Sequence, residues 1–270
     1  MMLEDNHEDI IAKAMRGKSI SKSSIAERAN VERSAIERIL RGEILEDVIA
    51  LIAPVLSLDS EKLLISARKV WSPKPIELTG VKRFVSDFGE MSVNAYVVYE
   101  QDSRRAWVFD TGTDCNSLIS FIEEDGLKVD SILLTHTHRD HISCLDKLKC
   151  KFPSANIYVH KTEQIDQSIL IEEGFQQSLD SLKLIALHTH GHSVGGMSYI
   201  IDGLSSPVAI VGDAIFAGSM GGGIVSFTDA LRTNREKLMT LSDETIICPG
   251  HGPMSTIGEE KKYNPFFPEF

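Results

Sequence analysis

The sequence is organised around one polar stretch, Thr135-His136-Thr137-His138-Arg139-Asp140-His141. It brings three imidazoles and a carboxylate into six consecutive positions, directly after the apolar run Ser131-Ile132-Leu133-Leu134. Neutral imidazole and carboxylate together are ligands that zinc, iron and manganese accept in proteins. A polar loop with incidental histidines is the alternative interpretation, but histidine is too rare for such a loop to produce this pattern often. The stretch therefore predicts a metal site that follows a strand.

Three later apolar runs also end in side chains that can bind a metal. We expect each run to be a strand buried on both faces, because its residues are continuously apolar. Ligands that follow neighbouring strands can converge at one edge of a sheet, where binding sites are commonly built. The runs and the residues that follow them are Leu184–Leu187 with His192, Val208–Val211 with Asp213, and Thr245–Cys248 with His251.

The same part of the chain contains other expected elements. Apolar and alternating segments predict four more strands. Asp114 and Gly126 are the expected start and end signals of a helix, and a second helix is expected after Asp140. The four strands are Met91–Tyr99, Ala106–Phe109, Val129–Leu134 and Ile157–Val159.

Taken in order, the candidate ligands resemble those of the metallo-β-lactamase superfamily: His136, His138, Asp140, His141, His192, Asp213 and His251. The segments 212–219, 249–253 and 255–266 resemble the glyoxalase II-like branch of that superfamily. The resemblance extends over about residues 81–266. It implies an α/β (α+β) fold of the αββα type, in which two β-sheets pack face to face, helices lie outside them, and a binuclear metal site lies at one edge.

The resemblance also implies how the ligands divide between two metal ions. Asp213 would bridge the ions, and a hydroxide held between them at near-neutral pH would attack a carbonyl carbon. Asp140 and Asp213 are therefore the candidate catalytic residues. Two divalent ions are expected, zinc first, with iron or manganese as alternatives. The ligands implied for the first ion are His136, His138 and His192, and those for the second are Asp140, His141 and His251.

Two further side chains are candidates for a supporting role. Asp110 follows an expected strand and is a plausible acceptor for the outer N–H of a ligand histidine, because such histidines usually donate that proton. His190 stands where the resembled branch more often has proline. It is interpreted either as a residue that supports a ligand or contacts substrate, or as an ordinary loop residue.

The surroundings of the predicted site bear on the substrate. Glyoxalase II-like relatives and persulfide dioxygenases typically carry a Gly-Arg pair near the position of Met220-Gly221-Gly222, where this chain has no arginine. Glyoxalase II also has a helical C-terminal extension, whereas this chain ends at Phe270, soon after His251. The prediction is therefore a hydrolase for a small ester, thioester or lactone, with a glutathione thioester in doubt.

Residues 1–70 predict a small all-α domain, which a linker, residues 71–80, joins to the metal domain, residues 81–270. Apolar residues recur at helical spacing from Asp9 to Arg68, and Ser72-Pro73-Lys74-Pro75 then breaks the pattern. The segment Lys22–Ile39 resembles the helix-turn-helix of phage-repressor-type transcription regulators. Asn30 stands where the chain must leave a helix in a left-handed conformation, which asparagine tolerates.

The charge of this small domain does not favour contact with DNA. Its acidic and basic side chains are nearly equal in number, and Glu32 and Glu37 lie among the arginines of the expected recognition helix. Phosphate contacts by basic side chains supply much of the affinity of such modules. The alternative is a helical bundle that packs on the metal domain or forms a homodimer.

Two alternatives to the hydrolase are left open. One is a persulfide dioxygenase of the same fold, which would use a single iron on His136, His138 and His192. The other is a DNA-binding regulator whose metal domain senses a metabolite.

Composition indicates a soluble protein. A net charge of −11 argues against binding nucleic acid or anionic membranes through bulk electrostatics. No apolar run reaches the length of a bilayer, and the acidic N-terminus lacks the apolar core of a secretory signal. The four cysteines show no paired spacing, which fits reduced thiols. We therefore expect a cytoplasmic location and no membrane contact.

Overall fold

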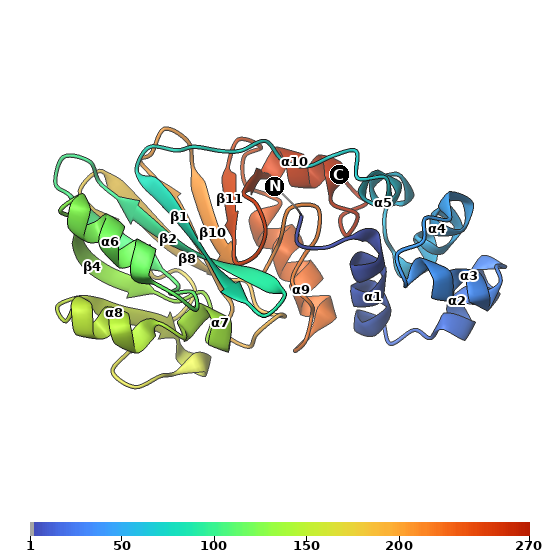
Figure 1. Ribbon diagram of the computed structural model, residues 1–270, viewed down its shortest axis with the longest axis horizontal. Coiled ribbons are helices and arrows are strands. Elements are labelled where there is room, and N and C mark those ends of the chain that lie inside the picture. Colours follow the sequence, from blue (N-terminus) through green and yellow to red (C-terminus); the bar gives the residue numbers. More distant parts are fainter. Residues whose placement is uncertain (1–2) are drawn as a thin grey trace.

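Two six-stranded β-sheets form the centre of the molecule in the computed structural model, which describes residues 3–270 (Figure 1). In the first sheet the neighbours β1, β2 and β3 are antiparallel, whereas β3, β4, β5 and β6 run parallel. Parallel strands need crossover connections, which helices supply between β3 and β4 and between β4 and β5. The strands are β1 (Val81–Phe88), β2 (Met91–Tyr99), β3 (Arg105–Phe109), β4 (Lys128–Leu133), β5 (Asn156–His160) and β6 (Ile169–Ile171).

The second sheet is mostly antiparallel. Its order is β12-β11-β10-β9-β8-β7, and only β10 and β11 are parallel neighbours. The helical segment between those two strands makes the crossover. The strands are β7 (Gln176–Leu179), β8 (Leu182–His188), β9 (Met197–Asp202), β10 (Val208–Gly212), β11 (Ile246–Pro249) and β12 (Ser255–Thr256).

Apolar side chains between the two sheets hold them face to face. Trp107 and Tyr96 of the first sheet and Tyr199 of the second are fully buried in this layer, and each such ring removes about 150–250 Å² from water. On the outer faces, α6 (Asn116–Glu124) and α8 (Leu145–Lys151) cover the first sheet, while α9 (Phe227–Thr233) and α10 (Ile257–Tyr263) cover the second (Figure 1). This order of layers confirms the predicted αββα fold class.

The seven strands expected from the sequence are all present, with ends that differ by at most two residues. The expectation that the three later strands are buried on both faces is confirmed for β10 and β11 but is wrong for β8. β8 lies beside the edge strand β7, and the helices cover its outer face only in part, so Ile185 and Leu187 are only partly buried. The patterns did not single out β1, β6, β7, β9 or β12.

Five α-helices form the N-terminal part of the described chain (blue in Figure 1). α2 ends at Asn30, whose φ of 53° is the left-handed conformation expected from the sequence. Apolar side chains such as Ile10 and Ile49 share one core with Phe266 and the residues under α9 and α10, so these helices pack on the outer layer of the second sheet. The helices are α1 (His7–Gly17), α2 (Lys22–Ala29), α3 (Arg33–Ile39), α4 (Glu46–Ile52) and α5 (Ser60–Ala67).

None of the helices within residues 3–270 has both the length and the apolar character that a membrane crossing requires.

Candidate metal centre

The seven candidate ligands lie together at one edge of the sandwich, just beyond the ends of four strands. The stretch after β4 leads into α7 (Arg139–Ile142) and supplies four of them, while the loops after β8, β10 and β11 supply one each. Their ligand atoms form three groups in which all atoms lie within 4.8 Å of one another. The groups are His136, His138 and His192; His136, His141 and Asp213; and Asp140, His141 and His251.

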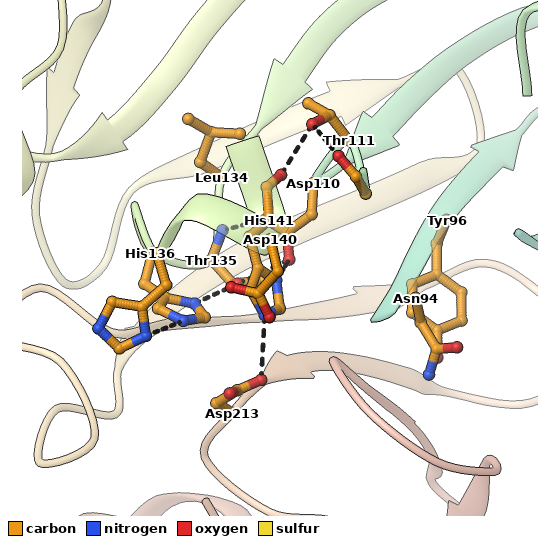
Figure 2. Close-up of polar contacts among 12 residues, drawn as sticks. Asn94, Tyr96, Asp110, Thr111, Leu134, Thr135, His136, Asp140, His141 and Asp213 are labelled. Atoms are coloured by element: carbon orange, nitrogen blue, oxygen red, sulfur yellow. Dashed lines mark hydrogen bonds and ion pairs between the residues drawn. The ribbon is translucent and has the colours of Figure 1, made fainter. Parts of the chain in front are cut away.

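Asp213 is at the centre of this arrangement. Its carboxylate lies 3.2 Å from Nε2 of His192, 3.3 Å from Nε2 of His141 and 3.4 Å from Nε2 of His251. Figure 2 shows Asp213 below the stretch that carries Asp140 and His141. A single carboxylate is therefore within reach of imidazoles from three separate loops.

Two polar atoms in the cluster lack the partners that buried polar atoms normally have. Oδ1 of Asp213 and Nε2 of His141 are buried, and neither has a hydrogen bond among the described residues. Nδ1 of His138 also lies 3.0 Å from Nε2 of both His136 and His192, and neutral imidazoles cannot all donate to one another there. A cation bound among these lone pairs resolves both features, so the residues present fit a metal.

Four of the five histidines are anchored through their outer ring nitrogen. Nδ1 of His192 donates to the carbonyl of Gly222 at 2.8 Å, and Nδ1 of His251 donates to the carbonyl of Ser92 at 2.6 Å. Nδ1 of His136 lies 3.0 Å from the Thr135 hydroxyl, and that of His141 lies 2.8 Å from Asp110. Such contacts fix the tautomer, which leaves Nε2 free to bind a metal.

Asp110 makes the contact that the sequence suggested, and it also shapes the loop. Its carboxylate accepts hydrogen bonds from Nδ1 of His141 and from both the backbone N–H and the hydroxyl of Thr135, each at 2.8 Å (Figure 2). The residue is buried at the end of β3 with a φ of 55°, a left-handed conformation that aspartate tolerates better than most residues. Asp110 therefore ties the start of the ligand stretch to one of its histidines.

His190 does not join the cluster, so the hypothesis that it supports a ligand finds no contact in the structure. Its ring stacks on His188 at 4.4 Å between centroids, and its Nε2 lies 3.8 Å from Asp229 of α9. Thr233 of α9 donates to its carbonyl. The reason is local: the loop after β8 passes against α9, which draws this side chain away from Asp213.

Sequence reasoning missed Glu163, which joins two of the ligand-bearing loops. Its carboxylate accepts from the hydroxyl of Thr137 at 2.9 Å and from the backbone N–H of Gly195 at 2.8 Å. The loops that carry His138 and His192 are thereby held together. No local pattern marks a lone glutamate in a polar segment for such a role, because its partners are distant in sequence.

Two glycines allow the chain to approach Asp213 closely. A Cβ at Gly221 would overlap the carbonyl of Asp213, and one at Gly250 would overlap its Oδ1 and the ring of His141. These positions lie in the segments around Gly221-Gly222-Gly223 and Pro249-Gly250-His251. The absence of a side chain at these two positions therefore leaves room for Asp213 and His141 in the cluster.

The metal-free cluster separates its histidines by charge. Burial opposes protonation of His141 and His251, but the carboxylates of Asp213, Asp110 and Asp140 outweigh it and raise the pKa to about 10 for His141 and about 11 for His251. Burial, together with the neighbouring imidazoles, holds the pKa of His136 well below its usual value. A metal must therefore displace protons from the two cationic rings.

A cavity of about 690 Å³ opens beside the cluster. His192, Asp213 and His251 lie on one side of it, with Phe216 and Gly221–Gly223 of the loop after β10. The opposite side comes from the N-terminal part of the chain, which the sequence did not connect to the site. Its residues there are Glu4, Asp5, Asp9, Lys13, Arg16 and Gly17.

The αββα sandwich, with imidazoles and carboxylates gathered at one edge, defines the class of the protein as a metal-binding protein of two packed sheets. The chain belongs to the metallo-β-lactamase superfamily, whose family profile matches residues 88–251, more than half of the chain. The match contains all seven candidate ligands and begins after the N-terminal helices.

Individual relatives agree with this assignment. The chain is 31% identical over 211 residues to "Probable metallo-hydrolase YqgX" of Bacillus subtilis (strain 168), which covers 67% of this chain and 95% of that protein. It is 32% identical over 192 residues to hydroxyacylglutathione hydrolase GloC of Haemophilus influenzae, over 61% of this chain and 88% of that protein. The crystal structure of the BLEG-1 B3 metallo-β-lactamase is 30% identical, with a TM-score of 0.61, and covers 69% of this chain and 99% of that one.

Proposed function

We propose that the chain is a binuclear metal-dependent hydrolase that acts on a small ester, thioester or lactone. The observation that carries the proposal is the position of Asp213, within 3.2–3.4 Å of three imidazoles from separate loops and with a buried oxygen that forms no hydrogen bond with any described residue. That oxygen and the clustered lone pairs offer donors to metal cations, which would replace the protons that His141 and His251 hold in the metal-free cluster. Zinc is the first candidate, with iron or manganese as alternatives.

The proposal divides the ligands between two positions. His136, His138 and His192 would hold one ion, Asp140, His141 and His251 the other, and Asp213 both; when bound, the ions supply an acidified water and polarise the carbonyl group that is attacked. Asp110, Ser92 and Gly222 hold the outer nitrogens of the ligand rings, so the ring planes are fixed before a metal arrives.

The carboxylates of Asp140 and Asp213 have a second task in this proposal. Both are buried beside the cluster, and each lies 3.2 Å from a ligand imidazole: Asp140 from His251, and Asp213 from His192. They can orient the attacking water and accept its proton. The two cysteines nearest in sequence to ligands do not offer a competing nucleophile: Cys144 and Cys248 are buried in cores, and burial raises the pKa of the Cys248 thiol far above its usual value.

The small size of the proposed substrate rests on the cavity and on its lining. A volume of about 690 Å³ accommodates a molecule of small-metabolite size. The similarity to GloC, a hydroxyacylglutathione hydrolase, supports an acyl transfer to water. The loop segment Met220-Gly221-Gly222 carries no arginine of its own, and the arginine that lines the cavity, Arg16, comes from α1. This difference from the glyoxalase II-like pattern speaks for an acyl substrate other than the glutathione thioester.

The other functions considered receive less support. A persulfide dioxygenase with one iron on His136, His138 and His192 would leave the buried group of Asp140, His141 and His251 without a metal ion. DNA binding remains a prediction, and the charges around α3 do not favour it. Arg33 pairs with Glu37 and Arg38 pairs with Glu43, which neutralises cations that phosphate contacts would need.

Metal analysis combined with a substrate panel tests the hydrolase proposal. We expect about two transition-metal ions per chain, loss of activity on chelation and recovery with Zn²⁺, Mn²⁺ or Fe²⁺. The panel contains small esters, thioesters and lactones. Protein that binds no transition metal and hydrolyses none of them after each metal is added would overturn the proposal.

A further inference from the structure

The outer wall of the cavity is one face of α1 and the segment before it. Asp9, Lys13, Arg16 and Gly17 follow helical spacing, so they share a face of α1, and all four line the cavity. A different stripe of the same helix, formed by Ile10, Ile11 and Ala14, is buried in the apolar core. α1 therefore has one side in the core and another that faces the metal cluster across the cavity.

Buried polar contacts fasten this wall to the loop that follows Asp213. Asp5 and Lys13 form an ion pair with side chains only 8% and 13% exposed. Lys13 also donates to the carbonyl of Met220 at 2.8 Å, and Ser219 donates to Asp5. The ion pair thus joins α1 to the loop whose Gly222 carbonyl holds His192.

Close packing fixes the two ends of the wall. Gly17 lies so near the Phe227 ring that a Cβ there would overlap it. At the other end, Glu4 lies against Gly252, next to His251. A wall held at both ends and in the middle has a fixed position relative to the metal cluster, unlike a loosely tethered domain.

The wall carries two cationic side chains, Lys13 and Arg16, and only Lys13 is paired among the described residues. Asp5 and Lys13 neutralise each other, and Asp9 accepts the backbone N–H of Asn6 as part of the cap of α1. Glu4, at the end of this wall, lies against Gly252, next to His251. Arg16, by contrast, is exposed and forms no ion pair or side-chain hydrogen bond with any residue in 3–270.

We propose that α1 is the specificity wall of the site and that Arg16 binds a carboxylate on the part of the substrate far from the bond that is cleaved. An unpaired guanidinium offers a planar pair of donors that matches a carboxylate. The inference rests on the proposed hydrolase function. It narrows the substrate class to acyl compounds, such as thioesters, whose leaving group carries a free carboxylate.

Matched thioesters test this proposal in the full-length protein. The probes are propionyl thioesters of N-acetylcysteine and of N-acetylcysteinylglycine, each compared with the analogue whose carboxylate is replaced by a carboxamide. Arg16→Ala should raise KM about tenfold for at least one carboxylate probe, with kcat nearly unchanged and with no change for its carboxamide. Arg16→Lys should recover part of the preference. Arg28→Ala, which removes an exposed arginine on α2 away from the cavity, is the matched control and should leave both KM values unchanged.

A binding measurement separates this proposal from the hydrolase proposal. Binding of the corresponding S-methyl compounds to metal-free protein is followed by NMR, which needs neither metal nor turnover. In one outcome the protein binds the carboxylate compounds selectively, loses that binding in Arg16→Ala, and yet hydrolyses none of the substrates. That result would support the role of Arg16 and overturn the hydrolase proposal. The role of Arg16 would be overturned if Arg16→Ala changed hydrolysis, or binding, of the carboxylate and the carboxamide by the same factor for both probes. It would also be overturned if the substitution changed neither.

Discussion

The two sides of the cavity differ in how the chain builds them. On the metal side, loops after four strands deliver seven histidine and aspartate side chains to one edge. On the opposite side, α1 and the segment before it contribute charged residues that reach the site only because they dock on the loop after β10. The first side depends on which residues are present, whereas the second depends on where a helix is placed.

The largest effect is expected on the metal side, from Asp213→Asn. The change removes the negative charge that faces three imidazoles, so metal binding and the orientation of water should both fail. We expect kcat/KM to fall on the order of a thousandfold, and metal content to fall below that of the unaltered protein. Steady-state kinetics and elemental analysis measure the two quantities.

Asp202→Asn provides the matched control, because Asp202 is an exposed aspartate at the end of β9. It should retain activity and metal. An Asp213→Asn protein with normal metal content and normal kcat/KM would show that the carboxylate is not a shared ligand. The metal side would then not depend on the identity of this residue, contrary to the comparison above.

The metal side could be predicted from sequence because the donor atoms themselves are diagnostic. His136, His138 and His141 fall within one short stretch, and apolar runs mark the strands that carry His192 and His251. The fold class followed from the resemblance that these ligands and their order have to the metallo-β-lactamase superfamily. The ends of elements and the exposure of β8 were less accurate, because they depend on neighbours that a local pattern does not contain.

The opposite side could not be predicted because its information is not local. Nothing in the sequence near Arg16 distinguishes it from other surface arginines, and Lys13 contacts both Asp5, before the helix, and the carbonyl of the distant Met220. Glu163 was missed for the same reason. A helical pattern indicates that α1 exists and which stripe is apolar, but it does not show what its polar face meets.

The second prediction weakens the opposite side by breaking its buried ion pair. Lys13→Met leaves Asp5 buried without its cation, and this should lower the free energy of unfolding by about 3–4 kcal/mol. Urea denaturation measures the change. Because α1 would then be less firmly fixed, KM should rise more than kcat falls.

The double variant Asp5→Asn with Lys13→Met should recover part of the lost stability, since no uncompensated charge remains. Lys22→Met, in which the lysine has no ion pair among the described residues, is the control and should change stability little. A loss for Lys13→Met no larger than the loss for Lys22→Met would mean that the pair does not hold α1 in place.

The third prediction concerns Glu260 of α10, which supports the loop between the two sides. It is fully buried, and burial raises its pKa to about 7 even though Ser255, Asn264 and the backbone N–H of Gly218 donate to its carboxylate. A carboxyl group whose pKa is higher in the folded state stabilises the protein below the unfolded value, near 4.5, and loses that contribution as pH rises through about 7.

Comparison with Glu260→Gln isolates this effect, because glutamine can keep the hydrogen bonds without ionising. Relative to the variant, the unaltered protein should lose up to about 3 kcal/mol of unfolding free energy between pH 4.5 and pH 8. Urea denaturation of both proteins at several pH values gives the difference. A difference that does not change with pH would show that Glu260 does not titrate in this range.

The smallest effect is expected from Asp110→Asn, which leaves every ligand in place and alters the acceptor that His141 and Thr135 share. Asparagine tolerates the left-handed conformation at this position, so the backbone should keep its path. The charge that holds the Nδ1–H of His141 is lost, however, and metal affinity should fall about 10–100-fold. Competition with a chromophoric chelator measures the affinity.

Asp180→Asn is the matched control, because Asp180 is also an aspartate with positive φ, at 53°, but lies in the exposed turn between β7 and β8. It should leave metal affinity unchanged. If Asp110→Asn binds metal as tightly as Asp180→Asn does, the ligand rings are oriented by packing rather than by their outer hydrogen bonds. The metal side would then resemble the α1 side, since its geometry too would depend on tertiary placement rather than on the residues that the sequence displays.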